Sequence, residues 1–313
     1  MSIQRLGLLL CTALLTSCTW IHWPTPAKPK VTPPDSIITV SRDVGTFRQL
    51  AVYGPAVVNL HTGSRTAVIL KGYASDMPKV STVVKGQQLL VMGYPTRMPF
   101  TIDITTPHIN RVVHDGEGAL IGHGLKASPL DVIVKNSGTT KLDGRLDVRL
   151  LSAKGTGTTE ISGLTSRNLM IKMRGNPELH LSGMASLEAL DVEGEGRLSF
   201  YWVKSNNFIM RAKGEALIQL AGLVDRLDVE LWDKVHFSGR FLRSKRAFVK
   251  THDDSIADIS AIEHQHTLAT DHSNIYFYNL SELKTDFMDE KGSVLDMRDW
   301  DGQFWKDYTR YNK

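Results

Sequence analysis

The sequence predicts an all-β protein, a β-solenoid (β-helix) of about nine coils of roughly 20 residues each. One short phrase recurs between Gly118 and Leu280: an apolar residue, a small or polar residue and, in most copies, glycine. Its copies begin at Ile121, Leu142, Ile161, Leu181, Phe200, Leu220, Phe237, Ile259 and Phe277, with separations of 17 to 22 residues. Because one such unit cannot bury its own apolar side, neighbouring units must stack to form a continuous core.

The pattern inside each unit indicates strands. Runs such as Leu227 to Leu231 alternate apolar and polar residues with a period of two, whereas helical repeats need a spacing of about 3.6. The runs end in residues that tolerate tight corners, as at Gly155-Thr-Gly157 and Asp253-Asp254. A leucine-rich repeat has a similar length, but it requires asparagine at a fixed interior position, and the sequence has no such column. The alternation of strand and corner favours a β-solenoid.

Residues 1–17 are predicted to be a lipoprotein signal peptide. Arg5 precedes the apolar run Leu6 to Leu15, which is shorter than the ~20 residues that span a bilayer. The sequence Leu15-Thr16-Ser17-Cys18 looks like a bacterial lipobox, in which the cysteine is acylated by palmitate-type chains and becomes the first mature residue. The alternative is an ordinary secretory signal that is cleaved nearby. We therefore predict lipidation at Cys18.

Two further residues bear on this export prediction. The only other cysteine, Cys11, lies in the removed segment, so the mature chain is expected to contain no disulfide. Thr19 follows the lipidated cysteine, and by resemblance to enterobacterial sorting this favours the outer membrane. We expect a lipid-anchored protein of the bacterial cell envelope, on its periplasmic or surface face.

The remaining segments flank the repeats. Residues 18–35 contain five of the chain's 12 prolines and are predicted to form an extended tether. Residues 36–117 contain short β-rich runs, with Lys85-Gly86 as a hairpin turn and Phe100 to Ile104 as a half-buried strand. This β-rich N-terminal layer is either a cap on the first coil or a separate small sheet domain that continues into the solenoid, which occupies residues 118–280.

Residues 281–313 lose the repeat and become rich in aromatic side chains, including Trp300 and Trp305. We predict either a C-terminal cap that covers the final coil or a tail that docks on a partner. The run Ser293 to Met297 predicts one last strand.

Part of the sequence resembles a known family. The stretches Val58 to Leu60 with Gly63, Val68 to Leu70 with Gly72, Lys85 to Val91 and Ile104 to Pro107 resemble the opening of the bacterial "putative auto-transporter adhesin, head GIN domain" family. The resemblance covers about residues 40–280. It implies a β-solenoid fold, export or lipid anchoring, and no catalytic residues to carry over. The chain is more aromatic than the usual member, as at Phe200-Tyr-Trp202.

Candidate catalytic residues do not converge in the predicted coils. Counting ten residues from each anchor places Asp131, Asp191 and Glu230 in one register, but on coils that are not adjacent. The residues expected between and beside them are Ser152, Ile171, Met210 and Ala247. A glycan-cleaving site needs acidic groups on neighbouring coils, so we predict that the protein is not an enzyme, with no catalytic residue and no cofactor.

Histidine and aspartate residues are concentrated between His252 and His272. His264 and His266 would lie on one face of a strand and could begin a metal site. A site also needs a third and a fourth ligand at the right distance, which the sequence does not show, and histidines in surface loops explain the run as well, so no metal is predicted. The formal net charge is +4, too small for a nucleic-acid-binding protein of this length.

The predicted function is a non-catalytic, lipid-anchored envelope protein that presents a rigid solenoid surface for binding, in the manner of an adhesin. Its expected partners are the membrane, through the anchor, and an envelope protein or polysaccharide. One alternative is a structural subunit of a multi-protein envelope or secretion complex. A second alternative is a glycan-cleaving β-helix enzyme.

Overall fold

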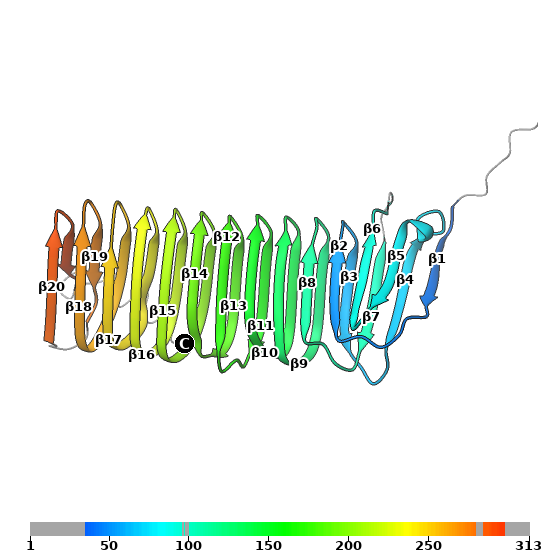
Figure 1. Ribbon diagram of the computed structural model, residues 1–313, viewed down its shortest axis with the longest axis horizontal. Coiled ribbons are helices and arrows are strands. Elements are labelled where there is room, and N and C mark those ends of the chain that lie inside the picture. The colour runs from blue at the N-terminus through cyan, green and yellow to red at the C-terminus, as the bar shows by residue number, and fades with distance from the viewer. Residues whose placement is uncertain (1–34, 96, 98–99, 280–283, 298–313) are drawn as a thin grey trace, which may run out of the picture. The chain divides into compact units, whose positions relative to one another are not determined.

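The computed structural model describes residues 35–95, 97, 100–279 and 284–297. The unit from Ser36 onward is a β-solenoid of about nine turns with 75% of the structure in strands, which confirms the predicted fold class (Figure 1). A single short 3₁₀ helix, Met77–Lys79, interrupts the strands of the described residues. No helix in these residues is long and apolar enough to cross a membrane.

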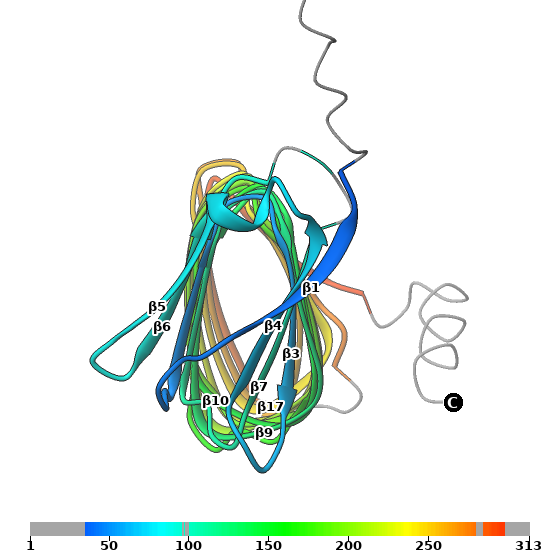
Figure 2. The same ribbon diagram turned by 90° about the vertical axis from the view of Figure 1, so that its right-hand side faces the viewer.

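The strands form two ladders that face each other across the core (Figure 2). The first ladder contains, in spatial order, β5 (Val80–Lys85), β6 (Gln88–Gly93), β2 (Gln49–Tyr53), β8 (Arg111–Asp115), the second halves of β9 (Ala119–Asn136) and β10 (Thr139–Gly155), β12 (Leu169–Gly175), β14 (Leu187–Gly194), the second halves of β15 (Arg197–Gly214), β16 (Leu217–Asp233), β17 (His236–Thr251) and β18 (Ile256–Thr270), and β20 (Lys284–Glu290).

The second ladder contains β1 (Ile37–Arg42), β4 (Ala67–Tyr73), β7 (Thr101–Thr106), β3 (Val57–Thr62), the first halves of β9 and β10, β11 (Thr158–Leu164), β13 (Glu178–Ala185), the first halves of β15 to β18, β19 (Asn274–Phe277) and β21 (Ser293–Asp296). Long strands such as β15 therefore cross from one ladder to the other at a bend.

The N-terminal region is built into the same ladders. Strands β2 and β3 lie parallel to β8 and β9, so parallel coils begin before Gly118. At the N-terminal end, β1 and β4 pair antiparallel in one ladder and β5 pairs antiparallel with β6 in the other. Antiparallel strands at this end cover an edge that parallel coils would leave open. The hairpin turn follows Lys85 as predicted, and Gly86 there has φ +61°.

The repeat phrase marks buried positions of the second ladder. Leu142, Ile161, Leu181, Phe200 and Leu220 pair with one another in succession and are at most 2% exposed. Ile121 is displaced by one position, because Gly122 pairs with Leu142. Phe237 is displaced by two, because it pairs with Ile218. In both coils the phrase itself begins at a different position of the strand, and a register shift follows in the same ladder. A fixed count along the chain therefore loses the alignment in these coils.

Two edges join the ladders. The corner edge contains stacked residues with positive φ: Gly155, Gly175, Gly194, Gly214 and Asp233. The bend edge lies opposite and contains the third residue of five successive phrases, all with positive φ: Gly144, Gly163, Gly183, Trp202 and Gly222. Strands β12 and β14 run toward the corner edge, which is uppermost in Figure 1.

Candidate functional site

A hollow lies on the outer surface of the first ladder, near its C-terminal end. This C-terminal groove has a volume of about 650 Å³. Its outward-pointing side chains come from five neighbouring strands, β15 to β18 and β20: Arg211, Asp228, Glu230, Phe248, Lys250, His266, Leu268, Asp286 and Met288.

Strand register explains why these side chains meet. Residues two apart on a strand point to the same face, so Asp228 and Glu230 both face outward from β16. The pairing places Arg211 beside Glu230, and Glu230 beside Lys250. The next column along the ladder brings Asp228 beside Phe248, and Phe248 beside His266. The groove is thus two adjacent columns of outward residues.

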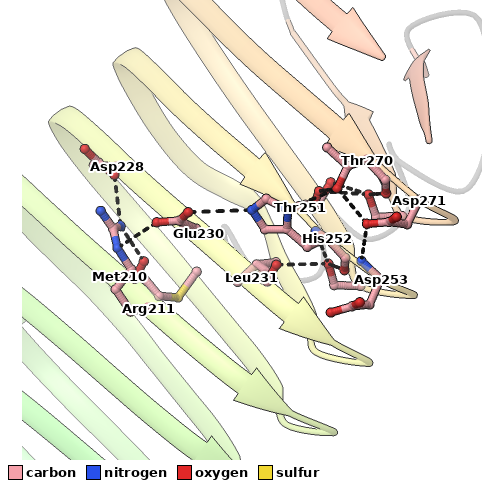
Figure 3. Close-up of polar contacts among 12 residues, drawn as sticks. Met210, Arg211, Asp228, Glu230, Leu231, Thr251, His252, Asp253, Thr270 and Asp271 are labelled. Carbon is pink, nitrogen blue, oxygen red and sulfur yellow. Dashed lines mark hydrogen bonds and ion pairs between the residues drawn. The ribbon is translucent and has the colours of Figure 1, made fainter. Parts of the chain in front are cut away.

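Arg211 binds two carboxylates of β16, those of Asp228 and Glu230. Its Nη1 atom lies 2.9 Å from Oδ1 of Asp228, and its Nε atom lies 3.2 Å from Oε2 of Glu230. The other oxygen of Glu230, Oε1, lies 3.6 Å from Nε2 of His252 (Figure 3). The guanidinium therefore links two coils and offsets part of the negative charge of the two carboxylates.

Aromatic rings stack along the same surface. The rings of Phe248 and His266 lie 5.0 Å apart at an angle of 9°, and the guanidinium of Arg226 lies 4.5 Å above the Phe248 ring. A second stack, Trp232 on His252, has its centroids 5.6 Å apart. These contacts hold the outward side chains in fixed positions, which lowers the entropic cost of binding a ligand.

The predicted register of the acidic residues was partly wrong. Asp191 and Glu230 do share a column, but Arg211 lies between them, where Met210 was expected. Lys172 and Lys250 flank this pair in place of Ile171 and Ala247.

Asp131 belongs to the neighbouring column, beside Leu150, and its carboxylate is bound by Arg149 at 2.6 Å. Register shifts in β9, β10 and β12 account for the error, because each shift moves the alternation relative to a fixed count. In the described structure the three carboxylates do not converge on one point.

The histidines of the last coils are distributed over different surroundings. His264 and His266 both face outward from β18, as predicted, and His266 contacts Asp286 at 3.3 Å between Nδ1 and Oδ2. His252 lies at a corner and contacts the hydroxyl of Thr270 at 3.0 Å (Figure 3). Within the described ranges, no three His, Cys, Asp or Glu side chains form a group that could hold a metal ion.

Aspartates replace glycine at the corner edge in these coils. Asp233, Asp253 and Asp271 all have φ near +60°. Oδ2 of Asp253 accepts a hydrogen bond from the backbone N–H of Asp233 at 3.0 Å, and Oδ2 of Asp271 accepts one from Asp253 at 3.4 Å. The hydroxyl of Thr270 and the Asp253 N–H lower the pKa of Asp271. This part of the acidic run therefore has a structural role.

A second, smaller hollow of about 360 Å³ lies on the outer surface of the second ladder. Its charged groups are also paired, with Lys141 bound to Glu160 at 3.0 Å and His123 bound to Asp143 at 2.6 Å. The backbone N–H of Gly124 and the ring of His123 lower the pKa of Asp143.

Sequence reasoning did not identify Arg211 or Phe248. The sequence feature that could have revealed them is the alternation of apolar and polar residues, because each is an outward residue in a strand whose inward residues are apolar. Neither residue forms a motif with its sequence neighbours. Cys18 and the aromatic residues from Trp300 onward lie outside the described residues, so lipidation and the role of the C-terminal tail stay predictions. Strand β21 (Ser293–Asp296) occupies the position predicted for a last strand.

Three solved structures are similar to the chain, at 12–14% identity: "a putative adhesin" from Parabacteroides merdae (TM-score 0.43, covering 83% of this chain and 95% of that one), a "putative adhesin" from Parabacteroides distasonis (0.44, 84% and 98%) and a "putative lipid binding protein" from the same organism (0.43, 83% and 96%). No curated protein matches the sequence.

The family comparison covers a shorter stretch than the sequence resemblance. A family model with the description "Putative auto-transporter adhesin, head GIN domain" matches residues 46–189. This stretch contains the N-terminal coils and the first repeats, from Phe47 to the middle of β14. Residues 46–189 of this chain are therefore similar to the head GIN domain family.

Proposed function

We propose that the protein is a non-catalytic, lipid-anchored, adhesin-like protein of the bacterial cell envelope, which binds an envelope or surface ligand through the C-terminal groove. The family match supports the adhesin-like role and a location in the envelope or outside the cell. The predicted lipobox at Cys18 supplies the anchor.

The observation that carries the proposal is the prearranged surface of the groove. Stacked rings, a bridging guanidinium and the exposed side chains of Lys250 and Met288 lie side by side on rigid strands. Such a surface offers apolar contact together with polar groups in fixed positions, which suits recognition.

The same contacts argue against acid-base catalysis in the groove. A glycosidase uses one carboxylic acid that is held protonated, in apolar surroundings. Here Arg211 touches both Asp228 and Glu230, and His266 touches Asp286. The three carboxylates of the groove are thus each placed beside a basic side chain.

Binding can be tested with isolated envelope fragments of the producing bacterium. The double variant Phe248→Ser with Lys250→Glu should lose co-sedimentation with these fragments, because it removes an aromatic contact and inverts a charge. A matched control, Lys141→Glu, changes an exposed lysine on the opposite ladder and should bind like the wild type. Equal binding by all three proteins would rule out the groove as the binding surface.

The anchor and the mode of assembly need separate measurements. Incorporation of a palmitate analogue should disappear in Cys18→Ser, and the chain should then leave the membrane fraction. After mild detergent extraction, the protein should migrate as a lipidated chain without companions. A large particle with a fixed set of other proteins would overturn the adhesin-like role in favour of a structural subunit.

A further inference from the structure

Trp202 occupies a position of the bend edge at which neighbouring coils have glycine. The third position of the phrase is glycine at Gly144, Gly163, Gly183 and Gly222, all with positive φ. Trp202 occupies the same position with φ +74°. A bulky side chain in this left-handed region is a conformational outlier, and such strain is kept where it has a use.

The tryptophan does not gain burial in exchange for this backbone conformation. Its side chain is 64% exposed. Met184, from the coil before, is 62% exposed, and Leu223, from the coil after, is 55% exposed. Strands β13, β15 and β16 are successive neighbours in the second ladder, so the three apolar tips lie within about 10 Å along the solenoid.

Basic residues surround this apolar row. In the strand pairing Leu223 lies beside Lys204 on one side and beside Arg243 on the other. Lys126 and Arg145 pair with each other further along the same edge, and both are exposed. The basic side chains of the edge are Lys126, Arg145, Arg167, Lys204, Arg226, Arg243, Lys245 and Arg246, against the acids Asp147, Glu188, Asp225 and Glu263. The edge therefore carries excess positive charge.

We propose that the bend edge docks on an anionic phospholipid surface through Met184, Trp202 and Leu223. Tryptophan prefers the level of the lipid headgroups, and lysine and arginine near such a surface are attracted to anionic lipids. Three apolar side chains bind a bilayer weakly by themselves. A chain that is already tethered needs only a weak second contact, because the tether raises its effective concentration at the membrane.

The length of the tether permits this arrangement. The sequence predicts that residues 18–35 form an extended tether, which at about 3.1 Å per residue would reach about 55 Å. Eight strand pairings separate β1 from β15 along the second ladder, which corresponds to about 40 Å. The docking of the bend edge rests on the lipid anchor of the proposed function. The experiment below replaces that anchor, so that failure of the docking proposal can be distinguished from failure of the anchor proposal.

The test uses the mature chain from Thr19, held by an N-terminal histidine tag on vesicles that contain a nickel-chelating lipid. Both native cysteines precede this start, so Leu223→Cys provides a single thiol for an environment-sensitive fluorophore. On vesicles of phosphatidylethanolamine and phosphatidylglycerol, emission should rise several-fold and be quenched by a nitroxide lipid. The control Tyr94→Cys, whose native side chain is 72% exposed at the corner edge beside Gly54, should not respond.

A second substitution separates docking from folding. Trp202→Gly restores the residue found in the other copies, so the chain should unfold at the same temperature as the wild type or higher. The Leu223 label should then lose its response to vesicles. An unchanged label signal in Trp202→Gly, or equal signals from Leu223 and Tyr94 labels, would overturn the proposal.

The lipid composition of the vesicles tests whether the bend edge requires an anionic surface. An equal response on pure phosphatidylcholine would refute the assignment to an anionic surface. A label at Leu223 that stays solvent-exposed on both kinds of vesicle, but becomes buried on addition of an envelope extract, would overturn the lipid surface in favour of a protein partner.

Discussion

The Nδ2 atom of Asn136 lies 2.8 Å from the Nδ1 atom of His114 in the interior of the solenoid. An amide N–H can only donate, so Nδ1 accepts this bond and the ring proton lies on Nε2. That atom has no hydrogen-bond partner in the described structure. Burial lowers the pKa of His114 to about 4, although Asp115 raises it in part. The side chain of His114 is therefore uncharged at pH 7.

His114 makes the fold sensitive to acid. Between its unfolded pKa near 6.5 and its folded pKa of about 4, the unfolded chain binds a proton that the folded chain does not. Stability is therefore complete above about pH 6.5 and falls as the pH drops toward 4, by about 3 kcal/mol in total. Urea unfolding of wild type and His114→Leu at pH 7 and pH 4.5 should show a smaller loss in the variant. Identical losses would contradict this account.

Phe200 should contribute strongly to stability. Its side chain is fully buried at the anchor position of its coil, so Phe200→Ala leaves a cavity that rigid ladders cannot close. We expect a loss of about 3–5 kcal/mol in the free energy of unfolding. Phe248→Ala, on the outer face, should cost clearly less. The midpoints of denaturant unfolding measure the stability loss of each variant. Equal losses for Phe200→Ala and Phe248→Ala would contradict the role of Phe200 in the core.

Arg211→Lys should weaken the link between β15 and β16. A lysine ammonium cannot reproduce the planar fork that reaches Asp228 and Glu230 together. Since the side chains are 40%, 32% and 24% exposed, solvent screening limits the expected cost to about 1 kcal/mol. Arg149→Lys is the control and should cost less, because the native Arg149 side chain is 59% exposed and its ion pair with Asp131 is screened more strongly by solvent. High salt should reduce the difference between the variants.

Asp253 should tolerate glycine better than alanine. Its φ of +58° disfavours any residue with a Cβ atom, and its carboxylate accepts the Asp233 N–H. Asp253→Ala loses the hydrogen bond and retains the strain of the wild type, so it should cost about 1 kcal/mol. Asp253→Gly loses the bond alone, and Asp253→Asn keeps an acceptor. In thermal unfolding, the melting temperature should rise from Asp253→Ala to Asp253→Gly to Asp253→Asn. A higher melting temperature for Asp253→Ala than for Asp253→Gly would contradict this account.

The sequence by itself determined the solenoid, because the constraint is periodic. Each coil must place an apolar residue such as Leu142 or Ile161 inward, and each must turn within a few residues. Because both requirements recur in every coil, they produce a repeat that can be recognised in a single sequence. The hairpin at Gly86 and the strand at Ser293 are equally local. Such features need only alternation and turn chemistry.

Only the tertiary structure decided which residues meet across coils. Register shifts at the bends move the alternation by one or two positions, so Arg211 lies beside Glu230 where counting placed Met210. The spatial order of the first coils, with β2 between β6 and β8, is likewise not sequential. Strand pairing depends on how neighbouring backbones align in space, and this alignment also gives Trp202 its place on an exposed edge.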